Sequence, residues 1–137
     1  MKIKHILLEG ATPKTVYHGG PEENLLQLLK NFEILSDEEK MSFSSTGGGE
    51  FGLSTSVDKH KAMKYSKAHG YDKVLAIKVA SGVKIKYIDD EIPNLNYYEL
   101  EELSNEGYDA VMETVTTAES ELRIFNPAKF KPIQLLK

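Results

Sequence analysis

Three short segments, far apart in the chain, carry the residue types that could do chemistry. The sequence is Val-Tyr-His-Gly-Gly at 16–20, Gly-Leu-Ser-Thr-Ser at 52–56 and Glu-Ser-Glu-Leu-Arg-Ile-Phe-Asn-Pro at 119–127. Each segment combines a short strand pattern with polar residues at one end of the strand, which is how a small β fold assembles a site from distant parts of its sequence. A carboxylate from the third segment could stabilise positive charge on a sugar ring, the main requirement for breaking a glycosidic bond.

The two carboxylates of the third segment, Glu119 and Glu121, lie two positions apart. Alternate side chains of a strand share one face, so both carboxylates could reach a single site. Charged pairs are also common on solvent-exposed edge strands, and spacing alone favours that plainer interpretation.

His18 in the first segment is followed by Gly19 and Gly20. A lone histidine after a strand is usually a structural residue. Two glycines remove the side chains that would cover the backbone, so we favour a binding role here. The segment Ser54–Ser56, taken alone, is also an ordinary polar strand end.

Short elements must position these residues. Helices are expected at 22–32, at 58–68 with Asp58 as N-cap and Gly70 as terminator, and around 97–103 before Gly107. Strands are expected at 15–18, 51–54, 74–79, 83–87, 109–112, 121–125 and 130–135, with 74–79 and 83–87 forming a hairpin. Many short strands with few short helices favour the α+β class over a parallel α/β fold.

The composition sets limits on the function. A chain of 137 residues is expected to form one domain, 1–137. Its net charge of −4 gives no basic footprint for nucleic acid, and the absence of cysteine excludes disulfides, thiolate catalysis and Cys-ligated zinc. The acidic run 89–91 is interpreted as a solvated loop, and no metal is expected. The apolar run near the N-terminus is too short for a signal peptide, so we expect a protein in the cytoplasm of the producing cell or of a host cell, spanning no membrane.

Together and in this order, the three segments resemble the NAD-consuming core of the ADP-ribosyltransferases, the family of the diphtheria-type toxins and the poly-ADP-ribose polymerases. The resemblance covers residues 15–135, and the sequence Gly-Tyr-Asp-Ala-Val at 107–111 adds to it. It implies an α+β fold in which two small, mostly antiparallel sheets flank an NAD cleft, with the helix 22–32 packed on one of them. It also implies that NAD is the substrate.

The resemblance implies a role for each polar residue of the second and third segments. Glu121 becomes the catalytic acid, which hydrogen-bonds the nicotinamide-side ribose and stabilises its cation. Ser54 orients Glu121. Glu119 contacts the acceptor in the toxin-like branch, and here both interpretations of Glu119 stay open. The threonine-rich stretch 113–118 corresponds to the turn that contacts the acceptor.

The resemblance also implies which residues bind the nucleotide. His18 holds a ribose hydroxyl, the Gly19 backbone binds the carboxamide, and Thr55 lines the site beside Ser54. Tyr65 is the candidate ring for stacking on nicotinamide, with Phe51 in reserve, although core packing explains Tyr65 equally well. The histidine is typical of the polymerase-like branch and the serines of the toxin-like branch, which leaves the acceptor and the mechanistic class open.

The expected function is NAD-dependent mono-ADP-ribosyl transfer to a macromolecule, with release of nicotinamide. The expected acceptor is a protein of the producing cell or of a host, including a defence-system protein; a nucleic-acid acceptor stays open. By analogy with small stand-alone family members, we expect a phage or toxin-effector context. Two alternatives remain: an NAD glycohydrolase that uses water as acceptor, and a catalytically silent module that binds a nucleotide or a protein.

Overall fold

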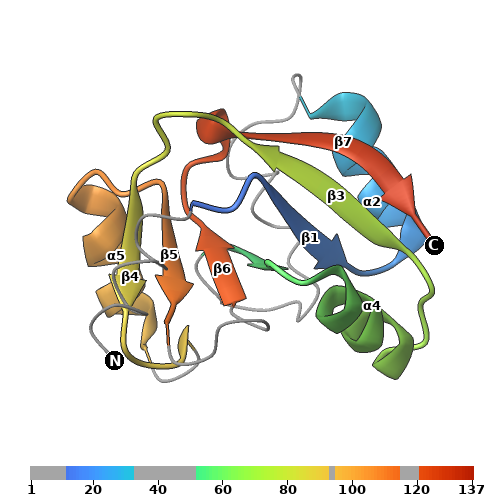
Figure 1. Cartoon of the computed structure of the whole chain (residues 1–137), viewed down its shortest axis with the longest axis horizontal. Helices are drawn as coiled ribbons and strands as arrows, with labels where there is room; N and C mark the ends of the chain where they lie inside the picture. The colour runs from blue at the N-terminus through green and yellow to red at the C-terminus, as the bar shows by residue number, and fades with distance from the viewer. Residues whose placement is uncertain (1–11, 33–51, 93–94, 115–120) are drawn as a thin grey trace.

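A computed structural model describes residues 12–32, 52–92, 95–114 and 121–137. Within these residues the chain forms an α+β fold of three helices and one seven-stranded sheet (Figure 1). The strands are β1 (Thr15–Gly19), β2 (Leu53–Ser56), β3 (Val74–Val79), β4 (Ile85–Ile88), β5 (Ala110–Glu113), β6 (Glu121–Ile124) and β7 (Phe130–Leu136). The helices are α2 (Glu22–Asn31), α4 (Lys59–Ala68) and α5 (Tyr97–Asn105), and a short 3₁₀ turn, η2 (Pro127–Lys129), precedes β7.

The sheet consists of two lobes that meet at a narrow junction. The strand order is β4-β5-β6-β2-β1-β3-β7, and every pairing is antiparallel except β4 with β5. The β2–β1 junction has a single register pair, Tyr17 with Ser56. We call β4, β5, β6 and β2 the β6 lobe, and β1, β3 and β7 the β3 lobe. In Figure 1, β4, β5 and β6 run steeply while β1, β3 and β7 run diagonally.

The α+β class and the mostly antiparallel pairing are confirmed, but the described strands do not form two separate sheets. The Tyr17–Ser56 pair joins the two lobes into one continuous sheet. The short length of the strands suggested two small sheets, because the sequence does not show that the ends of two of them, β1 and β2, would pair.

The expected hairpin between 74–79 and 83–87 is wrong. The turn itself exists, with the Val83 amide donating to the Ala80 carbonyl at 3.4 Å. However, both edges of β3 are already paired, one with β1 and the other with β7. With no free edge on β3, β4 crosses to the other lobe and pairs with β5 in parallel.

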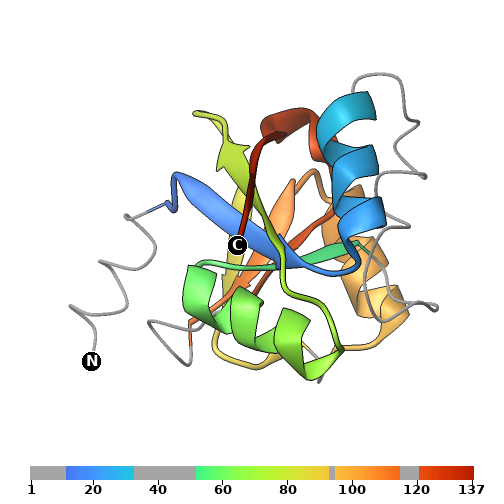
Figure 2. The same cartoon turned by 90° about the vertical axis from the view of Figure 1, so that its right-hand side faces the viewer.

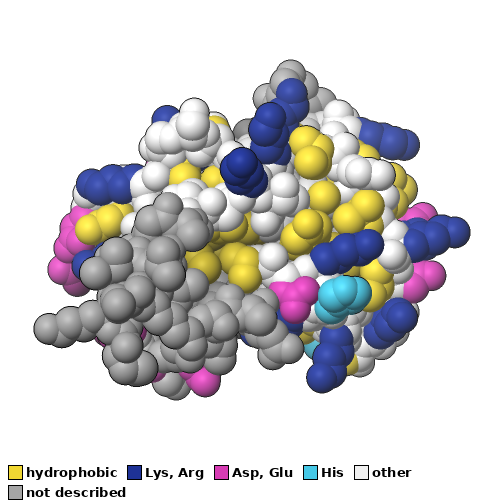
Figure 3. All heavy atoms as spheres, viewed as in Figure 1, with side chains coloured by type: hydrophobic (Ala, Val, Ile, Leu, Met, Phe, Trp, Pro, Cys, Tyr) yellow, Lys and Arg dark blue, Asp and Glu magenta, His cyan; other side chains and the backbone are white. Residues whose placement is uncertain are grey.

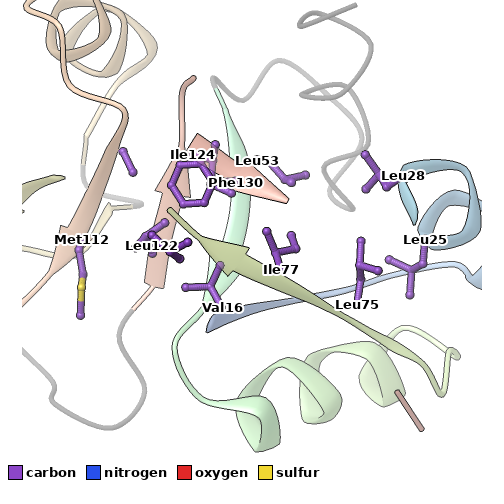
Figure 4. Packing of buried hydrophobic residues seen from close by; sticks show 12 residues of the cluster. Val16, Leu25, Leu28, Leu53, Leu75, Ile77, Met112, Leu122, Ile124 and Phe130 are labelled. Carbon is purple, nitrogen blue, oxygen red and sulfur yellow. The ribbon is translucent and has the colours of Figure 1, made fainter. Parts of the chain in front are cut away.

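Helix α2 anchors the β3 lobe, as expected from its apolar spacing. Leu25 and Leu28 are fully buried and belong to the same core cluster as Leu75 and Ile77 of β3. Figure 4 shows Leu25 pointing from α2 toward Leu75. Each such side chain contributes about 1.5–3 kcal/mol through burial. The helix packs on one part of the sheet, as expected, and its buried leucines stabilise the β3 lobe.

Helix α4 lies on the other side of the β3 lobe from α2 (Figure 2). It begins as expected, because the Asp58 carboxylate accepts a hydrogen bond from the His60 amide at 2.9 Å and so caps the helix. The chain leaves it at Gly70, whose φ of 84° suits glycine. Only Val57 and Asp58 separate the end of β2 from the start of α4, so the helix begins close to Ser56.

Helix α5 covers a second, smaller core in the β6 lobe. Its capping box is complete, because the Asn96 side chain and the Glu99 side chain each bond the other residue's backbone amide. Leu100 of α5 packs with Ile92, Val111 and Phe125. Of the helices the structure describes, none has both the length and the apolar character needed to cross a bilayer.

Candidate active site

The centre of the site is a hydrogen bond between two strands that are distant in sequence. In the antiparallel β2–β6 pair, Ser56 lies opposite Glu121 and Ser54 lies opposite Arg123. Ser54 and Glu121 are therefore diagonal neighbours on one face of the sheet. The Ser54 hydroxyl donates to Glu121 Oε2 at 2.8 Å, joining residues 67 positions apart. This register brings the second and third sequence segments together at one point.

Arg123 holds the same carboxylate from within β6. Its Nε and Nη2 donate to Glu121 Oε2 at 3.1 and 2.6 Å, because residues two apart on a strand share a face. Both side chains are largely buried, with 8% of Arg123 and 14% of Glu121 exposed. Among the residues that the structure describes, all three hydrogen bonds to this carboxylate go to Oε2. The carboxylate is therefore fixed through one of its two oxygens.

His18 connects this cluster to the β3 lobe. It lies inside β1 rather than after it, is 2% exposed, and its Nδ1 is 2.7 Å from the Ser54 carbonyl oxygen. A carbonyl oxygen can only accept, so Nδ1 carries the proton in this contact. The hydrogen bond supplements the single Tyr17–Ser56 register pair at the junction of the lobes. The first sequence segment therefore reaches the backbone of the second.

Gly19 has a packing reason to be glycine. A Cβ at this position would lie 2.6 Å from the Ala62 carbonyl oxygen and 3.1 Å from Ser66 Cβ. Helix α4 thus approaches the end of β1 more closely than any side chain would allow. This close approach positions β1 and α4 next to each other, and binding of a carboxamide by the Gly19 backbone stays a prediction.

The side chain of Thr55 is not part of the cluster. It alternates with Ser54 along β2, is buried, and its hydroxyl donates to the Leu122 carbonyl at 2.7 Å. This hydrogen bond fastens β2 to β6 from the face opposite Ser54. The expected nucleotide contact of Thr55 would therefore have to come from its backbone.

Tyr65 lies on α4, half-buried, with its ring 4.3 Å from the His69 ring at an angle of 35°. The His69 Nδ1 is also 3.0 Å from the Tyr65 carbonyl oxygen. Because α4 packs on β1 and β2, Tyr65 shares a helix with the residues that contact Gly19. Stacking of Tyr65 on nicotinamide stays a prediction. Glu119 and Phe51 lie outside the described residues.

Two charged residues near the centre were not assigned a role from the sequence. Arg123 could have been noticed, because it follows Glu121 at the spacing that puts both on one face. Glu113, at the end of β5, accepts a hydrogen bond from the Glu121 amide at 3.0 Å. The only sequence signal for it is an acidic residue closing an apolar strand, and that signal is weak. The stretch 113–118 was expected to be a turn, but Glu113 belongs to the strand and is buried.

A surface hollow of about 770 Å³ lies away from this cluster. Lys14, Lys78, Lys129 and Lys131 are among the residues that line it, together with parts of 12–13, 79–81, 128 and 130. It sits at the start of β1 and the end of β3, whereas His18 lies near the end of β1. Figure 3 shows Lys or Arg side chains over this part of the molecule. None of the expected site residues that the structure describes lines the hollow.

No group of three or more His, Asp or Glu side chains that could hold a metal ion occurs in the described part of the chain. The candidate site therefore consists of His18, Ser54, Glu121 and Arg123, drawn from β1, β2 and β6. Comparison of the chain with models of known protein families and with curated proteins finds no match.

Proposed function

We propose that this chain is an NAD-dependent mono-ADP-ribosyltransferase, which transfers ADP-ribose to a macromolecular acceptor, expected to be a protein, and releases nicotinamide. The observation that carries the proposal is the hydrogen bond from Ser54 to Glu121 at 2.8 Å. These two residues were paired on the basis of the family resemblance alone, 67 positions apart. A serine that orients a strand-borne glutamate is the arrangement that the resemblance implies.

In the proposed reaction, the bond between ribose C1′ and the nicotinamide nitrogen breaks and its electron pair leaves with nicotinamide. A nucleophile of the acceptor then bonds to C1′ and gives up a proton to solvent. Positive charge develops on the ribose, and the Glu121 carboxylate beside it would stabilise that charge. The protein holds Glu121 through Oε2. In the proposal, Oε2 therefore fixes the carboxylate to the protein, and Oε1 accepts a hydrogen bond from a ribose hydroxyl.

The two-lobed sheet supports an ADP-ribosyltransferase-like architecture for the proposed enzyme. In this proposal the β3 and β6 lobes take the place of the two sheets that flank the NAD cleft, and His18 lies where they meet. Nδ1 donates to the Ser54 carbonyl, and Nε2 is the other polar atom of the ring. The proposal assigns Nε2 to a ribose hydroxyl.

One observation favours a second candidate, the catalytically silent module. The Arg123 guanidinium contacts Glu121 Oε2 at 2.6 Å and partly neutralises the charge that a ribosyl cation needs. In a silent module this ion pair would be a structural contact only, and the site would bind a nucleotide without cleaving it. In the enzyme, Arg123 instead holds the carboxylate in a fixed position. Release of free nicotinamide distinguishes the two.

The test uses the purified full chain with NAD, with nicotinamide quantified by liquid chromatography. Release of nicotinamide above the rate in buffer supports the enzyme, and NAD binding without release supports the silent module. Incubation of a cell lysate with NAD labelled in the adenosine part then separates a transferase from a glycohydrolase. A transferase leaves label on macromolecules, whereas a glycohydrolase gives free labelled ADP-ribose only.

The Glu119→Gln variant sharpens the same test. If Glu119 contacts the acceptor, this variant lowers transfer of label more than it lowers nicotinamide release. Equal losses of both activities would argue against an acceptor role for Glu119.

A further inference from the structure

Glu113 is a buried acidic residue to which the proposed chemistry gives no role. It ends β5, is 5% exposed, and both of its carboxylate oxygens accept backbone hydrogen bonds. The Ile92 amide donates to Oε2 at 2.7 Å, and the Glu121 amide donates to Oε1 at 3.0 Å. Burying a carboxylate is costly unless it is well hydrogen-bonded, and bonds from N–H groups to a charged acceptor are strong. These two contacts explain how the fold tolerates Glu113.

The contact with Glu121 replaces a rung of the β5–β6 ladder. The register pairs run from Ala110 with Ile124, through Val111 with Arg123, to Met112 with Leu122. The next residues in this register are Glu113 and Glu121, and here the Glu113 side chain accepts the amide hydrogen. The carboxylate of Glu113 therefore helps to hold the start of β6, together with the pairing of Glu121 with Ser56 of β2.

The other oxygen of Glu113 is bound to a buried part of the chain next to the β6 lobe. Ile92, whose amide it accepts, is fully buried in the small core with Leu100. The Thr114 amide, one residue further along, donates to the Ile88 carbonyl at 2.9 Å. Hydrogen bonds thus hold the end of β5 against the segment 88–92, and the Glu113 carboxylate connects this segment to the Glu121 amide.

We propose that Glu113 is a positioning residue, whose carboxylate holds the first residue of β6 so that the Glu121 side chain meets Ser54 and Arg123. The expected effect on catalysis rests on the proposed function of Glu121. The effect on the start of β6 does not, because it follows from the hydrogen bond alone. A variant that loses this bond should lower turnover more than it weakens NAD binding, since Glu121 acts mainly in the transition state.

Asp109 provides a matched control. It lies just before the other end of β5, is 7% exposed, and its carboxylate also accepts two hydrogen bonds. The donors are the Lys84 amide at 2.8 Å and the Asn126 side-chain amide at 3.0 Å. Asp109 resembles Glu113 in burial and bonding but contacts the chain beyond the end of β6 instead of its start. Removing its carboxylate should lower the stability of the fold while Glu121 keeps its position, so the variant shows the effect of lost stability alone.

The experiment compares Glu113→Met with Asp109→Leu, because both substitutions keep the approximate size of the side chain and remove both acceptors. Glu113→Gln retains one acceptor oxygen and serves as the milder variant. The readouts are amide hydrogen exchange at Glu121 by NMR, and kcat and KM for nicotinamide release from NAD. They are measured at a temperature at which circular dichroism shows every variant to be folded.

In Glu113→Met we expect exchange at the Glu121 amide to be about tenfold faster, the scale of one lost hydrogen bond to a charged group. We expect kcat to fall by about tenfold or more, with KM for NAD changed by less than about threefold. Glu113→Gln should lie between the wild type and Glu113→Met. Asp109→Leu should keep both wild-type exchange at Glu121 and wild-type kcat.

Two results would overturn the proposal. One is unchanged exchange at Glu121 in both Glu113 variants, and the other is faster exchange with normal kcat. If Glu113→Met does not fold, Glu113→Gln decides by the same two readouts. A wild-type chain that releases no nicotinamide would refute the proposed function instead, and exchange at Glu121 would still decide whether Glu113 holds the start of β6.

Discussion

The two lobes of the sheet share one aliphatic core but differ in the charged side chains that they bury. In the β3 lobe the interior is aliphatic, with residues such as Leu75 and Ile77 packed against α2. The buried charged side chains of the described residues are Glu113 and Arg123 of the β6 lobe and Asp109, the residue before β5. Buried charges rarely add to stability compared with apolar residues of the same volume. The β6 lobe therefore differs from the β3 lobe in keeping charged side chains in fixed places, although both lobes contribute aliphatic residues to the same core.

The largest expected effect on stability lies in the β3 lobe. Leu25→Ala removes a fully buried side chain from the α2 interface, and it should lower the free energy of unfolding by about 2–5 kcal/mol. Urea denaturation followed by circular dichroism measures this change. Because Leu25 lies on α2, which packs mainly on β3 and β7 rather than on β6, nicotinamide release per folded molecule should stay at the wild-type rate. A loss of turnover in fully folded Leu25→Ala would contradict the expectation that the α2 interface contributes to stability and not to the candidate site.

A smaller effect is expected at the junction of the lobes. His18→Ala removes a buried ring that bonds the Ser54 carbonyl, and under the proposed function it should weaken NAD binding by about 1–3 kcal/mol. Isothermal titration calorimetry measures this affinity. His60→Ala, at an exposed position of α4, is the control and should bind NAD normally. Equal NAD affinity in both variants would count against a ligand role for His18.

The smallest effect is expected from an ion pair at the surface of the β3 lobe. Lys73 contacts Asp72 at 3.2 Å and Glu22 at 3.5 Å, and the pKa of Lys73 is raised, mainly by its hydrogen bond to Asp72. A raised pKa in the folded state means that the stabilisation is complete below the unfolded value of 10.5 and is lost as the pH rises through the folded pKa.

Lys73→Met should therefore be slightly less stable than the wild type at neutral pH, and this difference should shrink above about pH 10.5. Thermal melts at several pH values and at low and high salt measure it. A difference that grows with pH would contradict the assignment. The buried Arg123–Glu121 pair should respond much less to salt than the Lys73–Asp72 pair, in which the Asp72 side chain is 76% exposed.

Local signals in the sequence predicted the helices well. The Asp58 cap and Gly70 bound α4, and Leu25 and Leu28 mark the buried face of α2. These features depend on residues within one or two turns, so the sequence alone contains them. The apolar strand patterns also predicted most strand positions for the same reason.

Strand pairing could not be predicted in the same way. The hairpin expected after β3 was wrong because β1 and β7, from opposite ends of the chain, occupy both edges of β3. Which strands compete for an edge depends on the whole fold. The same is true of the Tyr17–Ser56 pair, which turns two small groups of strands into one sheet.

The sequence predicted the main residues of the candidate site but not the residues that hold them in place. The motifs pointed to Ser54 and Glu121, which the structure places within hydrogen-bonding distance. The side chain of Thr55 faces away because strand alternation puts it on the face opposite Ser54. Glu113 was missed because its role depends on a register between β5 and β6 that only the folded chain displays.

The most direct test of the proposed function is the turnover of Glu121→Gln. Glutamine keeps the size and much of the hydrogen bonding but removes the negative charge. NAD binding, measured by calorimetry, should be retained, and nicotinamide release should fall by on the order of 100-fold or more. Glu102→Gln, an exposed glutamate of α5, is the matched control and should release nicotinamide at the wild-type rate. Near-normal release by Glu121→Gln would contradict the enzyme proposed here.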